Sequence, residues 1–302
     1  MPEQLCKPGT AAQGPDFPRL VKPQTPHWSI PALGVATCRC HNHALVLDPR
    51  IHPASLNDQD LETLQIFGVR GVIAVADASA HPPTPEGIFA HFDELLGKQL
   101  PRLERSGLRA WAALGVHPRV LPHRGLGQVL EALPGYLKGG KIIALGQLGL
   151  FKGDEREEEA LLEQLGLAQQ FNLPAIVSAP GLDKERVTRR LLATLQRAEV
   201  EPARILVDGA VGRTVRVIRE LGYFAGLTLH PDHLTVEKAV ALVRSLGPER
   251  LVLDTAAGDG ASDILALGRA AHRLDKAGLS SKVIRRVTLD NAAALFGVHP
   301  HD

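Results

Sequence analysis

Hydrophobic positions follow two alternating patterns along this chain. Short apolar, β-branched runs predict buried strands, and longer segments with apolar residues every three or four positions predict helices. The predicted strands are Ala44–Leu47, Val69–Ala76, Ala110–Val116, Ile142–Leu145, Pro174–Val177, Arg204–Val207, Tyr223–Thr228 and Leu251–Leu253. The predicted helices are Asp58–Phe67, Glu86–Arg105, Gly125–Leu137, Glu155–Phe171, Lys184–Arg197, Arg213–Leu221, Thr235–Leu246, Ser262–Ala277 and Ser281–Phe296.

Repeated strand–helix alternation of this kind, over roughly 250 residues, is typical of a (β/α)8 barrel. A doubly wound open sheet is the alternative. It is disfavoured because no glycine-rich phosphate or dinucleotide loop follows the first predicted strand. We therefore predict an α/β protein with a single TIM barrel at residues 44–302 and an extra C-terminal helix. Residues 1–43 are rich in Pro, Gly, Gln and Thr and are predicted to form an irregular N-terminal arm.

The amino-acid composition disfavours some classes of binding partner. The formal net charge of the 302 residues is +1, which gives no global attraction to nucleic acid or to a membrane surface. The Arg-rich helices also carry Glu and Asp, so nucleic acid is disfavoured as a partner. No apolar run reaches the length of a membrane span, and the N-terminus lacks an apolar signal core. We therefore predict a cytoplasmic protein, and the identity of any protein partner stays open.

Cysteine and histidine gather in one short segment. The three cysteines are Cys6, Cys38 and Cys40, and His41 and His43 follow the last two. Thiolate and imidazole are zinc ligands, but the spacing of Cys38, Cys40, His41 and His43 is too tight for all four side chains to reach one ion easily. No disulfide framework follows from three cysteines, so a reducing compartment is expected. We interpret the cluster as a surface or strand-edge feature without a metal.

Candidate chemistry lies where the predicted strands end, because side chains at the carboxyl ends of barrel strands face the site. A hydrolytic metal site would need several His and carboxylate ligands to converge there. The chain instead has scattered polar groups, including a neutral amide in the glycine-bracketed segment Gly146–Gly149. The polar residues at these positions are Asp48, Arg50, His52, Asp77, His117, Gln147, Ser178, Asp208, His230, Asp254 and Thr255.

Seven segments in collinear order resemble the TatD-related metal-dependent hydrolases, in particular the archaeal TatD-like branch of the amidohydrolase superfamily. They are LDPRIHP at 47–53, ALGVHPR at 113–119, ALGQLGL at 144–150, LPAIVSAPGLDKE at 173–185, ILVDGAV at 205–211, GYFAGLTLHP at 222–231 and ERLVLDTAAGDGASD at 249–263. The resemblance runs from about Leu45 to Phe296. It implies a TIM barrel with a two-metal hydrolytic site and, in many members, deoxyribonuclease activity.

Most ligand positions that the resemblance implies hold other residues here. In the strand-one motif Asp-x-His-x-His, the first histidine is Arg50, and only the second is kept, as His52. The bridging glutamate of the Gly-Glu-x-Gly-Leu motif is Gln147. The histidine ending strand five, the histidine after the strand-six aspartate and the aspartate after strand eight are replaced by Ser178, Gly209 and Ala256.

These replacements favour a degenerate metal site. Arg50 places a permanent cation where a metal would lie, and Gln147 has no charge with which to bridge two ions. Arg50 is expected to pair with Asp48, Asp208 or Asp254. The leading hypothesis is a pseudoenzyme that binds a small ligand or a protein partner at the barrel mouth, or serves as a scaffold. No metal and no other cofactor is expected.

The alternative is a working hydrolase of the phosphodiesterase or deoxyribonuclease class. It would use a rearranged or single-metal site with Zn, Mn or Mg. Its residual catalytic candidates are His117, Asp208 and Asp254, with His52 as the retained ligand. Under either hypothesis the predicted pocket is formed by Asp48, Arg50, His52, His117, Gln147, Ser178, Asp208, His230 and Asp254.

Overall fold

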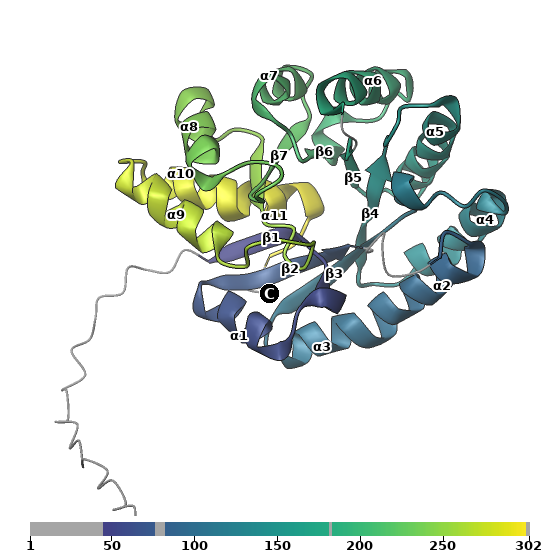
Figure 1. Cartoon of the computed structure of the whole chain (residues 1–302), viewed down its shortest axis with the longest axis horizontal. Helices are drawn as coiled ribbons and strands as arrows, with labels where there is room; N and C mark the ends of the chain where they lie inside the picture. The colour runs from purple at the N-terminus through teal and green to yellow at the C-terminus, as the bar shows by residue number, and fades with distance from the viewer. Residues whose placement is uncertain (1–44, 76–81, 181–182, 300–302) are drawn as a thin grey trace, which may run out of the picture. The chain divides into compact units, whose positions relative to one another are not determined.

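The computed structural model describes residues 45–75, 82–180 and 183–299. In this part, eight parallel strands form one sheet in chain order, and helices lie around its outside (Figure 1). The predicted (β/α)8 TIM barrel is therefore confirmed. The strands are β1 (Val46–Ile51), β2 (Val69–Val75), β3 (Arg109–Leu114), β4 (Ile142–Gly149), β5 (Ala175–Ser178), β6 (Ile205–Asp208), β7 (Phe224–Thr228) and β8 (Leu251–Asp254).

Helices connect these strands, and α9, α10 and α11 follow β8. The α-helices are α1 (Asp58–Ile66), α2 (Pro85–Glu94), α3 (Leu100–Arg105), α4 (Leu126–Leu137), α5 (Glu155–Gln170), α6 (Lys184–Arg197), α7 (Gly212–Glu220), α8 (Val236–Leu246), α9 (Ala266–Lys276), α10 (Ser281–Arg285) and α11 (Asn291–Phe296). Short 3₁₀ turns lie at Pro53–Ser55, Pro118–Val120 and Pro202–Arg204.

The first and last strands meet where the barrel closes. Ile51 forms a parallel bridge with Ala257, and the His52 backbone N–H donates to the Ala257 carbonyl at 2.7 Å. Along the sheet, Ser178 is in register with Asp208. Parallel pairing therefore brings the polar strand ends to one rim, the carboxyl end of the barrel.

Two hydrophobic clusters divide the core. The larger one lies between the strands and the surrounding helices. The smaller one joins buried strand residues, such as Leu47, Ile176 and Val252, to Leu289 and Phe296 near the C-terminus. Because α11 packs against β1 and β8, this segment covers the interior at the amino ends of the strands. The carboxyl end is left for a site.

Five predicted strands end too early. β1 continues to Ile51 rather than Leu47, and β4 continues to Gly149 rather than Leu145. β5, β6 and β8 each include one further residue, Ser178, Asp208 and Asp254. All six residues of β1 are buried, although two of them, Asp48 and Arg50, carry charged side chains. An apolar run underestimates a strand whose polar side chains find partners inside the barrel.

The helix predicted at Glu86–Arg105 is divided by a π-helical segment, Leu95–Gln99, between α2 and α3. Pro101 explains the change, because proline lacks a backbone N–H and its ring crowds the preceding turn. The helix predicted at Ser281–Phe296 likewise contains a π-helical segment, Arg286–Asp290. There, the Thr288 hydroxyl donates to the Ile284 carbonyl and competes for a backbone acceptor.

The helix predicted from Ser262 begins only at Ala266. Before it, the Ser262 hydroxyl accepts from the Gly258 N–H at 2.9 Å, and the Asp263 carboxylate accepts from the Leu265 N–H at 3.0 Å. Side chains that bond nearby backbone groups favour a turn over a helix.

Several predictions fall outside the described residues. They are the N-terminal arm with its boundary at residue 43, the cysteine–histidine cluster at 38–43 and the strand-end aspartate Asp77. Within the described ranges, every helix is too short or too polar to traverse a lipid bilayer.

Candidate functional site

Strand periodicity brings polar side chains to the barrel mouth. Residues two apart on a strand point to the same face, so Ser178 and Asp208 follow the interior residues Ile176 and Leu206. Asp254 follows Val252 in the same way. The interior is therefore apolar at the amino ends of the strands and polar at the carboxyl ends.

Arg50 lies at the centre of this polar layer. Its guanidinium Nη1 is 2.6 Å from Asp208 Oδ2, and its Nη2 is 3.4 Å from Asp259 Oδ2. The side chain is 8% exposed. Burial disfavours the charge of Arg50, but the neighbouring carboxylates outweigh burial and raise its pKa. Of the three partners that the sequence left open for Arg50, Asp208 forms the ion pair.

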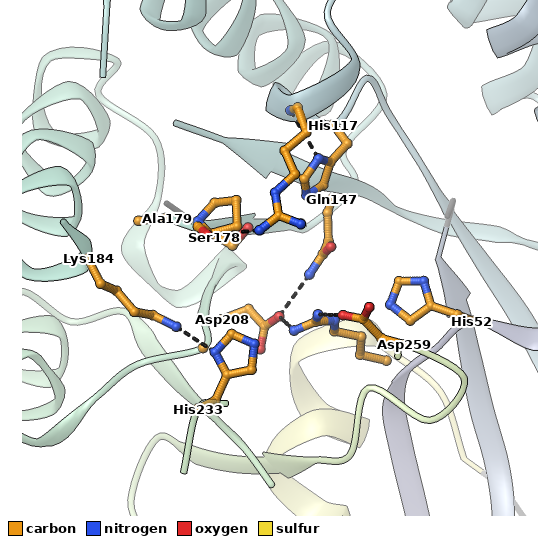
Figure 2. A pocket seen from close by; sticks show the side chains of 13 residues that line it. His52, His117, Gln147, Ser178, Ala179, Lys184, Asp208, His233 and Asp259 are labelled. Carbon is orange, nitrogen blue, oxygen red and sulfur yellow. Dashed lines mark hydrogen bonds and ion pairs between the residues drawn. The ribbon is translucent and has the colours of Figure 1, made fainter. Parts of the chain in front are cut away.

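Gln147 supports the same carboxylate. Its Nε2 donates to Asp208 Oδ2 at 2.9 Å, so this oxygen accepts from both Gln147 and Arg50 (Figure 2). Burial would raise the pKa of Asp208, but the Arg50 guanidinium outweighs burial and holds the pKa below its usual value. A glutamate at position 147 would bring a second carboxylate to this anion, so the amide suits the Arg50–Asp208 pair.

Asp254 has the opposite protonation behaviour. The Thr228 hydroxyl lies 3.1 Å from Asp208 Oδ1 and 3.2 Å from Asp254 Oδ2. Burial, together with the charge of Asp208, raises the pKa of Asp254 well above its usual value. The Thr228 hydroxyl has one proton and can donate to only one of these two oxygens. Both contacts are satisfied if Asp254 is protonated and donates to the Thr228 oxygen, while the Thr228 hydroxyl donates to Asp208.

Asp48 faces the closure of the barrel. Its Oδ1 accepts from the backbone N–H groups of Arg50 and Thr255 at 3.2 and 3.3 Å, and its Oδ2 accepts from the Thr255 hydroxyl at 2.5 Å. Burial raises the pKa of Asp48 to about 6, although these hydrogen bonds oppose the change. Asp48 thus links β1 to the segment after β8.

Lys184 and His233 form a second polar group, which the sequence prediction missed. The Lys184 Nζ donates to His233 Nδ1 at 2.8 Å (Figure 2). Burial and the nearby Lys184 lower the pKa of His233 to about 4, so this imidazole is neutral near pH 7. A Cβ at Gly209 would lie 3.0 Å from Nζ, and φ of Gly209 is +63°. The lysine therefore covers the position where the family resemblance implies a histidine.

A cavity of about 140 Å³ opens between these groups. Six of the nine predicted pocket residues line it, and they are Arg50, His52, His117, Gln147, Ser178 and Asp208. Asp48, His230 and Asp254 are buried nearby but do not belong to its lining among the described residues. The lining residues that the prediction missed are Arg119, Ala179, Pro180, Lys184, Gly209, His233 and Asp259.

Two of the predicted histidines have defined structural bonds. His117 precedes the turn Pro118–Val120, and its Nδ1 accepts from the Arg119 N–H at 3.2 Å. His230 Nδ1 accepts from the Asp232 N–H at 3.1 Å, and its Nε2 is 3.0 Å from the Asp259 carbonyl. His230 therefore positions the loop that carries Asp259.

His, Cys, Asp and Glu side chains are the candidates for metal ligands at the mouth. Across residues 45–75, 82–180 and 183–299, no three His, Cys, Asp or Glu side chains are grouped to hold a metal ion. Asp208 Oδ2 already accepts from Arg50 and Gln147. A guanidinium cannot lose its proton to become a ligand.

Comparisons with known proteins place the whole barrel among hydrolase-like relatives. No family model matches the chain. Over 252 residues it is 27% identical to an uncharacterized metal-dependent hydrolase of Methanocaldococcus jannaschii, which covers 83% of this chain and 99% of that protein. Over 162 residues it is 32% identical to an uncharacterized metal-dependent hydrolase of Escherichia coli, which covers 49% of this chain and 58% of that protein.

Solved structures give the same picture. A TatD-like protein from Archaeoglobus fulgidus matches with a TM-score of 0.70 and 25% sequence identity. The match covers 83% of this chain and 100% of that one. The similarity therefore extends over the full length of a solved barrel and includes its mouth.

Proposed function

We propose that this chain, which belongs to the TatD-like family of metal-dependent hydrolases, is a non-catalytic member that binds a small ligand at its barrel mouth without a metal ion. The Arg50–Asp208 contact of 2.6 Å carries the proposal. It puts a fixed cation against a carboxylate at the strand ends, where a hydrolase of this family would hold its metal.

The neighbouring residues support the same conclusion. Gln147 donates to the oxygen that Arg50 contacts, so this atom has two N–H donors and no remaining role as a metal ligand. Ser178 and Gly209 stand at further ligand positions implied by the family and supply no charge. These changes are mutually consistent, since a cationic side chain and a neutral amide together satisfy one buried carboxylate.

A hydrolase with a single-metal site is the competing function. Its favouring observation is that His52, His117 and Asp208 line the same cavity. For Asp208 to bind a metal, Arg50 would have to give up its buried ion pair and leave the space that it fills. We therefore rank this function second.

Metal content and hydrolysis separate the two functions. Protein purified from cells supplied with Zn, Mn and Mg should contain well under one equivalent of metal by mass spectrometry. It should not hydrolyse bis(p-nitrophenyl) phosphate above the rate of a His123→Ala control, in which an exposed loop histidine is removed. Stoichiometric metal, together with activity that chelator, His52→Ala and Asp254→Ala each abolish, would overturn the proposal.

A further inference from the structure

Lys184 is a cationic side chain that contacts no carboxylate among the residues that the structure describes. Its Nζ bonds His233 Nδ1, which belongs to a neutral imidazole, and no described acidic side chain lies within ion-pair distance of it. Burial lowers the pKa of Lys184, and the charge of Arg50 opposes the attraction of Asp208 and Asp254. Lys184 is half-buried, and an ammonium withdrawn in this way from water is costly without an anion beside it. A ligand can supply that anion.

Ser178 points to the same conclusion independently. Its hydroxyl is buried, and it has no hydrogen-bond partner among the described residues. Figure 2 shows Ser178 on the wall of the cavity that Lys184 and Gln147 also line. Buried hydroxyls normally have a partner, so a ligand acceptor in this cavity would complete the bonding of Ser178.

Arg119 provides a second cation at the cavity. Its guanidinium stacks over the Phe151 ring at 5.2 Å, and its Nη2 donates to the Pro180 carbonyl at 3.1 Å. These contacts hold the side chain without neutralising it, because neither partner carries a negative charge. A fixed guanidinium presents paired N–H donors that match a carboxylate.

Charge and size define the ligand class. Among the described residues, three cations line the cavity, Arg50, Arg119 and Lys184, against two carboxylates, Asp208 and Asp259. The excess is one positive charge, which suits a single negative charge better than a dianion. The volume of about 140 Å³ is also below the roughly 300–1,000 Å³ of pockets for drug-sized ligands.

We propose that the cavity binds a small monocarboxylate, whose carboxylate lies between Lys184 and Arg119 and accepts a hydrogen bond from the Ser178 hydroxyl. This inference rests on the proposed function, because it assigns a ligand class to the same metal-free pocket. A hydroxyl or carbonyl group next to the carboxylate would find a further hydrogen-bonding group in Gln147, which lines the cavity as well.

Calorimetry with defined probes tests the ligand class. Chelator-treated protein of measured metal content is titrated with acetate, glycolate, lactate and pyruvate, and separately with malonate, inorganic phosphate and neutral lactamide. At least one monocarboxylate should bind with a Kd of about 1 mM or lower. It should bind at least about tenfold more tightly than malonate, phosphate or lactamide.

Variants test the site. Lys184→Met removes the charge and should weaken binding of the best monocarboxylate by at least about tenfold. Lys138→Met removes an exposed lysine after α4, near the amino end of β4, and should leave binding unchanged. Ser178→Ala should weaken binding by a smaller factor. Unaltered thermal unfolding of Lys184→Met shows that the variant is folded.

Three results would overturn the ligand proposal. They are a preference for phosphate, equal binding by Lys184→Met and wild type, and no binding of any monocarboxylate to metal-free protein. Failure of the proposed function looks different, since it requires bound metal and chelator-sensitive hydrolysis. The two failures are therefore distinguished by the same protein preparation.

Discussion

Arg50 and Lys184 are both cationic side chains at the barrel mouth, but they lie in different surroundings. Arg50 contacts Asp208 at 2.6 Å and Asp259 at 3.4 Å, and Gln147 supports the same carboxylate. Lys184 contacts a neutral imidazole at 2.8 Å. The charge of Arg50 is compensated within the protein, whereas no carboxylate of the described residues contacts Lys184. Under our proposal, the Arg50 side of the mouth stabilises the fold and the Lys184 side binds the ligand.

The largest expected effect follows from removing Arg50. Arg50→Met leaves Asp208 buried without its main cation, and breaking a buried ion pair in this way costs about 3–5 kcal/mol. Urea unfolding at pH 7 measures the loss. Lys184→Met removes a cation that no described carboxylate contacts, so the free energy of unfolding should change by no more than about 1 kcal/mol.

A double variant supplies the control for Arg50. Arg50→Met combined with Asp208→Asn removes both charges and should recover much of the lost stability, because no buried charge is left unpaired. If the double variant were as unstable as the sum of the two single variants, the Arg50–Asp208 pair would not be the source of the effect. An unstable Lys184→Met would equally contradict the comparison.

This division of the mouth was only partly predictable from sequence. The predicted apolar runs placed Ser178, Asp208 and Asp254 at the carboxyl ends of the strands, because each of these residues directly follows such a run. The choice among three carboxylates for Arg50 was not predictable. It depends on the irregular register of β1 between Asp48 and Ile51, which sets where the side chain points.

The Lys184–His233 pair was not predicted from the sequence for a different reason. Lys184 is the first residue of α6, and His233 lies in the loop before α8, so neither follows a strand directly. Their contact joins residues 49 positions apart through two loops, and no local pattern encodes it. The barrel itself was predictable, because each strand and helix carries its own hydrophobic period.

The next effect in size is a pH dependence of the free energy of unfolding, and it comes from Asp48, which lies next to Arg50 in β1. Its pKa rises from 3.8 to about 6 in the folded protein, so the native state keeps a proton that the unfolded state has already lost. The free energy of unfolding should therefore fall as pH rises from about 4 to about 6. A shift of about two pKa units corresponds to about 3 kcal/mol.

Asp48→Asn isolates this contribution, because an amide does not titrate. Relative to wild type, the variant should gain about 3 kcal/mol of stability between pH 4 and pH 7 in urea unfolding. A constant difference between the two proteins across this window would mean that Asp48 does not titrate there. Because the pKa of Asp208 is lowered, its carboxylate becomes protonated only below this pH window and does not contribute to the difference measured within it.

The smallest effect distinguishes two neighbouring carboxyl groups. Burial and the charge of Asp208 raise the pKa of Asp254 well above its usual value and so favour its neutral form, and Asp254→Asn should therefore cost no more than about 1 kcal/mol. Asp208→Asn removes the anion that Arg50 contacts and should cost about 3 kcal/mol. Urea unfolding at pH 7 compares the variants.

If Asp254→Asn proved as costly as Asp208→Asn, both carboxyls would be ionised, and a single cation, Arg50, could not balance them. Lys184 would then have to supply the second positive charge, and the cavity would lose the excess cation on which monocarboxylate binding depends.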